Sequence, residues 1–151
     1  MAVREVEVLI PADDIRRRVG ELAAEIDRDY ADVAELVCIG VLKGSVFFLV
    51  DLVRELDLPV VIDFFQTSSY GDSTAPGEVR IRKDLELSVR GRHVLLVEDI
   101  VDTGYTRRTI LDLLHFRGAA SVKLCTLLDK PTARGAGYLW RDPPDPDQRV
   151  R

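Results

Sequence analysis

Three acidic residues and a turn rich in hydroxyl groups directly follow an apolar run near the middle of the chain. Residues 94–97 read Val-Leu-Leu-Val, and Glu98, Asp99 and then Asp102 come after them. The next residues, Thr-Gly-Tyr-Thr at 103–106, lead into a stretch with helical spacing. Such an apolar run is typical of a buried strand in a parallel sheet. Because the first N–H groups of a helix have no partner within it, this turn is a candidate binding site for an anion such as phosphate.

The acidic residues beside the turn need a separate explanation, because they would repel a bare phosphate group. Carboxylates suit the hydroxyl groups of a ribose or a divalent cation carried by the same ligand. A sugar phosphate that carries Mg²⁺ is a ligand that would explain why the apolar strand, the turn and the acidic residues occur together. The alternative is a plain strand-to-helix turn in which Asp102 and Thr103 only cap the helix.

Helices and strands that alternate along the chain would position these residues. Apolar residues at helical spacing predict helices over 11–30, 46–56 and 106–117, the last ended by Gly118. Short apolar or alternating runs predict strands over 36–42, 59–65, 79–83, 92–97 and 121–128, with a polar loop over 66–78. This order predicts an α/β fold with a mainly parallel, twisted sheet flanked by helices. Ligands of such sheets bind beyond the carboxyl ends of the strands.

Composition narrows the functional class. The 151 residues suit one domain, and 46% of them are hydrophobic, which is enough for a sizeable core. The net charge of −5 argues against general binding of nucleic acid, and no apolar run is long enough to span a membrane. The first residues lack the apolar stretch of a signal peptide, and Cys38 and Cys125 lie within apolar runs. We therefore expect a cytoplasmic protein with two reduced, buried cysteines.

Four short motifs, in this order along the chain, resemble the hypoxanthine-guanine phosphoribosyltransferase family of the type I phosphoribosyltransferases. They are Val41-Leu42-Lys43-Gly44-Ser45, Ser68-Ser69-Tyr70-Gly71, the run from Glu98 to Thr106, and Leu127-Leu128-Asp129-Lys130-Pro131. The third motif alone, which is similar to the family's phosphoribosyl-diphosphate (PRPP) motif, indicates only the larger class. The first and second make the resemblance specific to this family.

The resemblance implies roles for the residues that would meet the pyrophosphate and the ribose of PRPP. Lys43 and Gly44 would contact the pyrophosphate, with a cis peptide bond between Leu42 and Lys43. Glu98 and Asp99 would hold the ribose hydroxyl groups, directly or through Mg²⁺. On local sequence alone, the alternative for Lys43 is an ordinary solvated lysine of a turn.

The resemblance also implies how the 5′-phosphate and the purine would be held. The 5′-phosphate would lie in the turn formed by Thr103, Gly104, Tyr105 and Thr106. Asp102 would be the catalytic residue, taking the proton from N7 of the purine. Lys130 would donate to O6 of the purine, and Arg134 would lie near the pyrophosphate. The alternative for Lys130 is a residue that simply ends a strand. Ser69 and Tyr70 would belong to a lid over the site, although in a polar loop such residues usually have no role.

These implications describe a purine-salvage enzyme. It would transfer phosphoribose from PRPP to hypoxanthine or guanine, giving IMP or GMP and pyrophosphate, with Mg²⁺ as cofactor. Its partners would be PRPP and a 6-oxopurine base, with no nucleic acid and no membrane, and it would form a homodimer or homotetramer. The alternative is a non-catalytic protein on the same fold, either a nucleotide-sensing regulator or an inactive remnant.

The last residues depart from the family pattern. We expect a phosphoribosyltransferase core over residues 1–132 and a divergent, irregular tail over 133–151, because the tail is rich in proline and in alternating charges. Family members continue with a hood segment that supplies an aromatic residue stacked on the purine. Tyr138 and Trp140 do not match that pattern. We therefore expect incomplete hood strands, weak purine binding and impaired activity.

Overall fold

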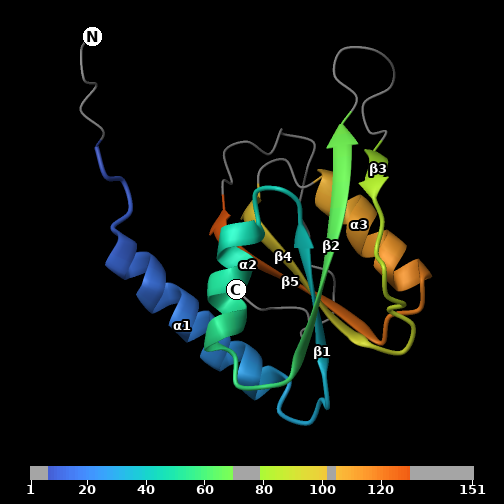
Figure 1. Cartoon of the computed structure of the whole chain (residues 1–151), viewed down its shortest axis with the longest axis horizontal. Coiled ribbons are helices and arrows are strands. Elements are labelled where there is room, and N and C mark those ends of the chain that lie inside the picture. The colour runs from blue at the N-terminus through green and yellow to red at the C-terminus, as the bar shows by residue number, and fades with distance from the viewer. Residues whose placement is uncertain (1–6, 70–78, 102–104, 130–151) are drawn as a thin grey trace.

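The described residues, which are 7–69, 79–101 and 105–129, form three helices and five strands in a computed structural model (Figure 1). For Ser69, Tyr105 and Thr106 only the backbone is described. The helices are α1 (Ala12–Asp29), α2 (Val46–Glu55) and α3 (Tyr105–Phe116). The strands are β1 (Leu36–Val41), β2 (Val60–Ser69), β3 (Val79–Lys83), β4 (His93–Val101) and β5 (Ser121–Asp129). None of the described helices is long and apolar enough to cross a membrane.

The strands form one sheet in the order β3-β2-β1-β4-β5. β2, β1, β4 and β5 are parallel, and β3 runs antiparallel to β2 at one edge. The two central strands are buried on both faces, which is why the sequence shows continuous apolar runs there. The predicted α/β fold with a mainly parallel sheet and flanking helices is confirmed.

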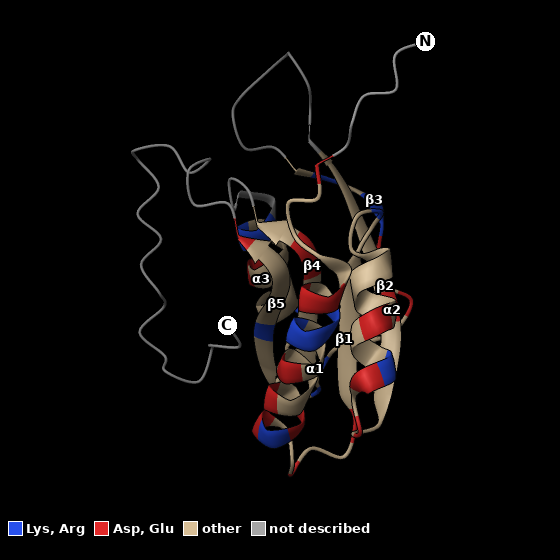
Figure 2. Cartoon of the chain, turned by 90° about the vertical axis from the view of Figure 1, so that its left-hand side faces the viewer, with Lys and Arg blue, Asp and Glu red and all other residues tan. Residues whose placement is uncertain are grey.

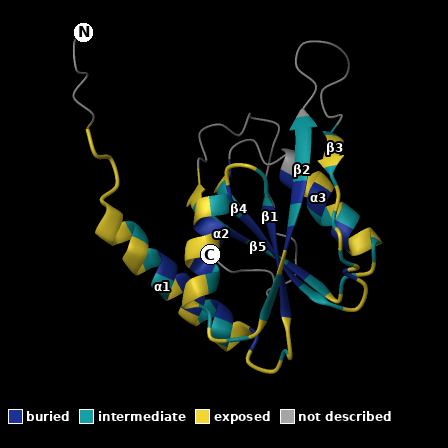
Figure 3. Ribbon diagram, viewed as in Figure 1, coloured by how far each residue is buried: buried dark blue, intermediate teal, exposed yellow. Residues whose placement is uncertain are grey.

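Helices cover both faces of the sheet (Figures 1 and 3). One core cluster joins α1 and α2 to the sheet and contains Cys38 and Cys125, both fully buried and both free. The other cluster lies under α3 and contains Val37 and Ile39 of β1. Adjacent residues of β1 thus point to opposite faces, as the period of a strand requires. The prediction of two buried, reduced cysteines is confirmed in the structure.

The helix α1 shows how its sequence places one face on the core and the other in solvent. Val19, Leu22, Ala23 and Ile26 are buried, at the spacing of one helical face. On the opposite face, arginines and acidic residues three or four positions apart form ion pairs, such as that of Arg17 with Glu21. Figure 2 shows these alternating charges along α1.

The C-terminus of α3 is closed by the predicted glycine. Gly118 has a φ of 86°, in the left-handed region where a side chain is unfavourable. Its N–H group donates to the carbonyl of His115, and the N–H of Ala119 donates to that of Leu114. These two bonds form a Schellman motif, which satisfies carbonyl groups at the end of the helix.

Three strands extend beyond their predicted ends, β5 by the single residue Asp129. β2 continues through Ser69, so the loop predicted over 66–78 is wrong for residues 66–69, which pair with β3. β4 continues to Val101, because Ile100 and Val101 pair with residues of β5. Pairing with a neighbouring strand supplies the hydrogen bonds that keep these segments extended, and local composition does not reveal this pairing. Residues 130–151, which include the predicted tail, lie outside the described residues.

Candidate active site at the carboxyl edge of the sheet

The carboxyl ends of the four parallel strands lie at one edge of the sheet, the upper edge in Figure 1. Of the predicted site residues, Lys43 and Gly44 follow β1, Ser69 ends β2, and Glu98 and Asp99 lie near the end of β4. A parallel sheet brings these segments together although up to about a third of the chain separates them. The prediction that the site residues share this edge is therefore correct for the described ones.

The turn after β1 lies directly against the Asp99 carboxylate. A Cβ atom added to Gly44 would be 2.6 Å from Oδ2 and 3.0 Å from Oδ1 of Asp99, which is closer than real Cβ contacts allow. Only glycine fits this position without displacing the carboxylate. The peptide bond between Leu42 and Lys43 is cis, as the family resemblance implies, and the Leu42 N–H donates to the carbonyl of Phe65 at 2.8 Å.

Glu98 carries a buried carboxylate oxygen that lacks a hydrogen-bond partner among the described residues. This atom is Oε1. Burial raises the pKa of Glu98 to about 7, although the Arg107 charge opposes the shift, while the Asp99 charge adds to it. A buried carboxylate without a partner is costly in a folded protein. A hydroxyl group or a cation of a ligand would relieve this cost.

The carboxylates of Glu98 and Asp99 fit the chemistry of a Mg²⁺ site. Mg²⁺ prefers oxygen ligands, and proteins commonly hold it with one or two carboxylates while substrate phosphates and water complete its coordination. Across residues 7–69, 79–101 and 105–129, no group of three or more acidic, histidine or cysteine side chains gathers to form a cage. The described residues therefore suit a cation that arrives with a phosphorylated ligand.

Arg107 is a residue near the site that sequence reasoning missed. It lies in the first turn of α3, and only 7% of its surface is exposed. Its positive charge acts on Glu98 and favours the ionised carboxylate. An arginine immediately after the Thr-Gly-Tyr-Thr turn was the signal available in the sequence. Sequence reasoning also missed Asp63, which is buried within β2 away from these residues, and its signal was a lone acidic residue in the apolar run 60–65.

Several predicted site residues lie outside the described residues. They are Tyr70, Asp102, Thr103, Gly104, Lys130 and Arg134. The backbone of Tyr105 and Thr106 begins α3, so the predicted helix N-terminus at the end of the motif is confirmed. Lys43 is exposed on the turn after β1.

Comparison with known proteins places this architecture among phosphoribosyltransferases. A family model described as the phosphoribosyl transferase domain matches residues 11–140. The hypoxanthine phosphoribosyltransferase of Haemophilus influenzae is 47% identical over 137 residues, covering 89% of this chain and 76% of that protein. The hypoxanthine-guanine phosphoribosyltransferase of Bacillus subtilis is 47% identical over 131 residues, covering 86% of this chain and 72% of that protein.

Solved structures agree with these sequence comparisons. A crystal structure of a hypoxanthine-guanine phosphoribosyltransferase from Bacillus anthracis matches with a TM-score of 0.81 and 40% identity, covering 88% of this chain and 79% of that one. A mutant of the Trypanosoma cruzi hypoxanthine phosphoribosyltransferase, complexed with the product IMP, matches with a TM-score of 0.80 and 40% identity. That match covers 89% of this chain and 73% of the Trypanosoma chain.

Proposed function

The chain belongs to the hypoxanthine-guanine phosphoribosyltransferase family. From this membership we propose that it transfers phosphoribose to a purine base at the carboxyl edge of its sheet. It is a purine-salvage enzyme that moves phosphoribose from PRPP to hypoxanthine or guanine. One observation carries the assignment of the site. The buried Glu98 oxygen without a described partner lies next to Asp99, which itself packs against Gly44.

In the proposed site, Glu98 and Asp99 hold the ribose hydroxyl groups and the cation, and Lys43 and Gly44 contact the pyrophosphate. In this reaction N9 of the purine displaces pyrophosphate from C1′ of the ribose, and positive charge develops on the sugar in the transition state. Carboxylates close to the sugar stabilise this charge. When bound, Mg²⁺ would neutralise negative charge on the leaving pyrophosphate.

Further roles are proposed for residues outside the described ranges. Asp102 takes the proton from N7 of the purine, a step for which general base assistance is typically worth about 10²–10⁴-fold in rate. Lys130 donates to O6 and so favours 6-oxopurines over adenine. Residues 103–106 wrap the 5′-phosphate, and the α3 N-terminus adds its favourable dipole. Ser69 and Tyr70 close over the substrate, and Arg134 lies near the pyrophosphate.

We also propose a homodimer or homotetramer in the cytoplasm that binds no nucleic acid. The acidic net charge of −5 supports the last point, because a nucleic-acid-binding surface is normally basic. Light scattering of the purified protein gives its oligomeric state.

A turnover assay tests the proposed function. We expect the protein, supplied with PRPP and Mg²⁺, to form IMP from hypoxanthine or GMP from guanine, and to leave adenine unchanged. Asp99→Asn should weaken binding of PRPP with Mg²⁺, because it removes a charge from the site, and Asp102→Ala should chiefly lower kcat. If PRPP binds but no purine is converted, the non-catalytic alternative is correct. If PRPP does not bind, the assignment of the site is wrong.

A further inference from the structure

Asp63 is an acidic residue buried in the sheet, away from the residues assigned to the reaction. It lies on β2 opposite Ile39 of β1, and only 6% of its surface is exposed. Its side chain has four partners. Oδ1 accepts from the N–H of Phe64 at 2.7 Å, and Oδ2 accepts from the N–H groups of Glu86 at 2.8 Å and Leu87 at 3.1 Å. The Lys83 ammonium lies 3.7 Å from Oδ1.

The segment that Asp63 holds has no regular structure of its own. Residues 84–89 connect β3 to the turn before β4, and they belong to no helix or strand. Leu85, Leu87 and Val89 pack against the core cluster under α3, so the segment runs close to the sheet. Backbone N–H groups in a segment that packs on the core, but that forms no hydrogen bonds within a sheet or helix, need other acceptors. The carboxylate of Asp63 supplies one oxygen to two of them.

Lys83 adds a second set of contacts at the same place. Its ammonium group donates to the carbonyl of Phe64 at 3.3 Å and to that of Asp84 at 3.2 Å, and it pairs with Glu86 at 3.3 Å. We call the contacts of the Asp63 carboxylate and the Lys83 ammonium, apart from the ion pair with the exposed Glu86 side chain, the Asp63 clamp. Because Lys83 ends β3 and pairs with Gln66 of β2, the clamp lies at the base of the β2–β3 hairpin.

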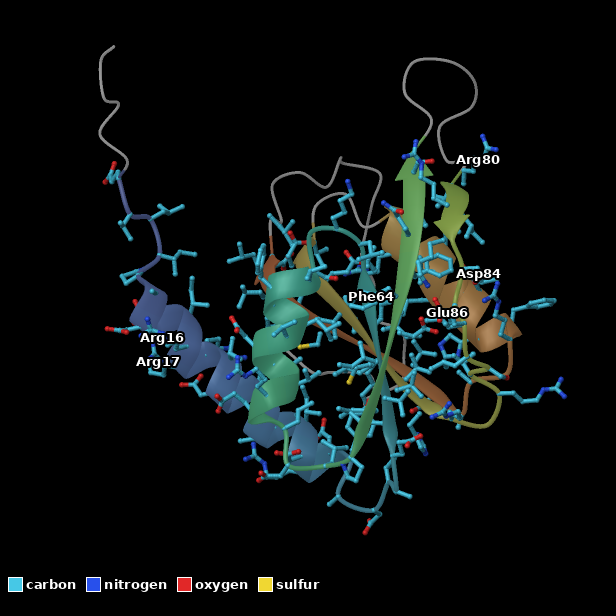
Figure 4. The ribbon with its side chains drawn as sticks, in the orientation of Figure 1. Arg16, Arg17, Phe64, Arg80, Asp84 and Glu86 are labelled. Carbon is cyan, nitrogen blue, oxygen red and sulfur yellow. The ribbon has the colours of Figure 1, made fainter. Side chains whose placement is uncertain are left out.

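The clamp is also joined to α3. The Asp84 carboxylate accepts two hydrogen bonds from the Arg117 guanidinium, at 2.6 and 2.7 Å, and Arg117 follows the last turn of α3. Figure 4 shows Asp84 and Glu86 beside each other below β3. The base of the hairpin is thus bonded both to β2 and to the C-terminal end of α3. The N-terminal end of α3 lies at the proposed phosphate turn.

The far end of the hairpin lies at the edge of the sheet that carries the site. β2 and β3 run from the pair Gln66 and Lys83 at the clamp to the pair Ser69 and Val79 at the tip. We propose that Asp63 is a positioning residue, whose clamp holds the β2–β3 hairpin so that its tip stands at the substrate site. This inference rests on the proposed function, because it takes the end of β2 at Ser69 as part of the substrate site.

Asp63→Asn tests the proposal. Asparagine has nearly the same shape, but its NH₂ group would face the N–H of Phe64 or those of Glu86 and Leu87, and it loses the attraction to Lys83. We expect the amides of β3 to exchange with solvent about tenfold faster or more, and more so than the slowest amides of β1 and β4. We also expect KM for PRPP to rise by about tenfold while kcat changes little, because a loose tip weakens ground state and transition state alike.

Glu86→Gln is the matched control. It removes a carboxylate that pairs with the same Lys83 but is 82% exposed, and it leaves every backbone bond of Asp63 in place. We expect this variant to change neither KM nor the exchange of β3. A merely structural Asp63 would give a different pattern, in which all slow amides of the Asp63→Asn protein exchange faster by one common factor and KM is unchanged. That pattern overturns the proposal.

Lys83→Met provides a milder change if Asp63→Asn does not fold. It removes the ammonium and its bonds to the Phe64 and Asp84 carbonyls, but the Asp63 oxygens keep their three N–H donors. A selective rise in β3 exchange and in KM supports the clamp, and exchange and KM values equal to those of Glu86→Gln contradict it. Because exchange is measured without substrate, the clamp is tested even if the proposed reaction fails.

Discussion

Gly44 and Asp99 are two proposed site residues that lie close together in the described part of the chain. The Asp99 carboxylate occupies the space that a Gly44 side chain would fill, at 2.6 Å from the position of its Cβ atom. Glycine therefore has a steric role here, apart from any contribution of its backbone to pyrophosphate binding. Any larger residue must displace the carboxylate that is proposed to hold the ribose and the cation.

We predict that Gly44→Ala weakens binding of PRPP with Mg²⁺ by about tenfold or more, as expected when a carboxylate that contacts the ligand is displaced. The free energy of unfolding should change little, because Gly44 is exposed. Isothermal titration calorimetry measures the affinity, and urea unfolding measures the stability. Gly20→Ala in α1 is the control, because its Cβ atom would meet nothing within 4 Å. Equal affinity in Gly44→Ala and wild type would show that Asp99 has no role in binding.

Asp63 leads to a prediction about acid stability. Burial would raise its pKa, but the N–H groups of Leu87, Phe64 and Glu86 and the Lys83 charge together hold the pKa below its ordinary value. A carboxyl group with a lowered pKa stabilises the fold above its unfolded pKa of about 3.9, and this contribution is lost as the pH falls through the folded value.

We predict that Asp63→Asn lowers the free energy of unfolding by about 1–3 kcal/mol near neutral pH, because buried N–H groups lose their acceptor. As the pH falls from about 4 through the lowered pKa of the folded state, the difference from wild type should shrink, because the Asp63 carboxyl group of the wild type then becomes protonated in both states. Urea unfolding at a series of pH values between neutral and strongly acidic measures the loss of stability and its dependence on pH. A difference that stays constant down to the lowest pH would mean that the charge of Asp63 does not contribute.

At the scale of elements, the close packing of α2 on the sheet sets the position of the turn before it. Gly40 of β1 lies under the start of α2, where its Cβ atom would be 2.8 Å from Cδ2 of Leu49 and 3.1 Å from Cδ1 of Phe64. It would also be 3.0 Å from Oγ of Ser45, the fully buried residue that precedes α2. The missing side chain of Gly40 thus allows α2 and its N-terminal turn to approach β1.

We predict that Gly40→Ala destabilises the protein by about 1–3 kcal/mol, because an extra methyl group forces a well-packed core apart. The change moves the start of α2 and so also weakens PRPP binding through Lys43 and Gly44. Urea unfolding and calorimetry measure the two effects. Gly20→Ala again serves for comparison, and in that helix position alanine should stabilise by about 0.5–1 kcal/mol. A Gly40→Ala protein as stable as wild type would show that α2 can shift freely.

At the scale of the whole molecule, the proposed site lies at one edge of the sheet, and a ligand bound there would join segments from distant parts of the chain. The turn after β1 and the carboxylates of β4 meet there, and α3 begins there. A ligand that binds only the folded state stabilises the whole fold, because the unfolded chain lacks the assembled site.

We predict that PRPP with Mg²⁺ raises the Tm, and that removing Mg²⁺ with a chelator reduces the shift produced by PRPP. At a ligand concentration of about 100 times Kd, the stabilisation is about 2.7 kcal/mol. Differential scanning fluorimetry with PRPP, with pyrophosphate alone and with IMP measures this. Asp99→Asn should show a smaller shift. An unchanged Tm at saturating PRPP and Mg²⁺ would contradict the assignment of the site.

The local sequence was sufficient to predict most of the segments that become helices and strands, and it indicated the residues that are proposed for the site. The buried face of α1 follows from the spacing of Val19, Leu22 and Ile26, and the central strands follow from runs of apolar residues. The motif from Glu98 to Thr106 indicated a site at the start of a helix, and α3 begins within it. These features depend on neighbours a few residues away, so short-range patterns reveal them.

Only the tertiary structure decided how distant residues act on one another. Residues 66–69 are a strand because β3 pairs with them, and Glu98 has a raised pKa because the fold buries it beside Asp99. The steric requirement for Gly44 arises from a side chain of another strand. Asp63 holds residues 86 and 87 because the tertiary structure places their N–H groups, which form no hydrogen bonds within the sheet, beside its carboxylate. Such effects come from contacts between segments far apart in sequence, and no local pattern encodes where those segments meet.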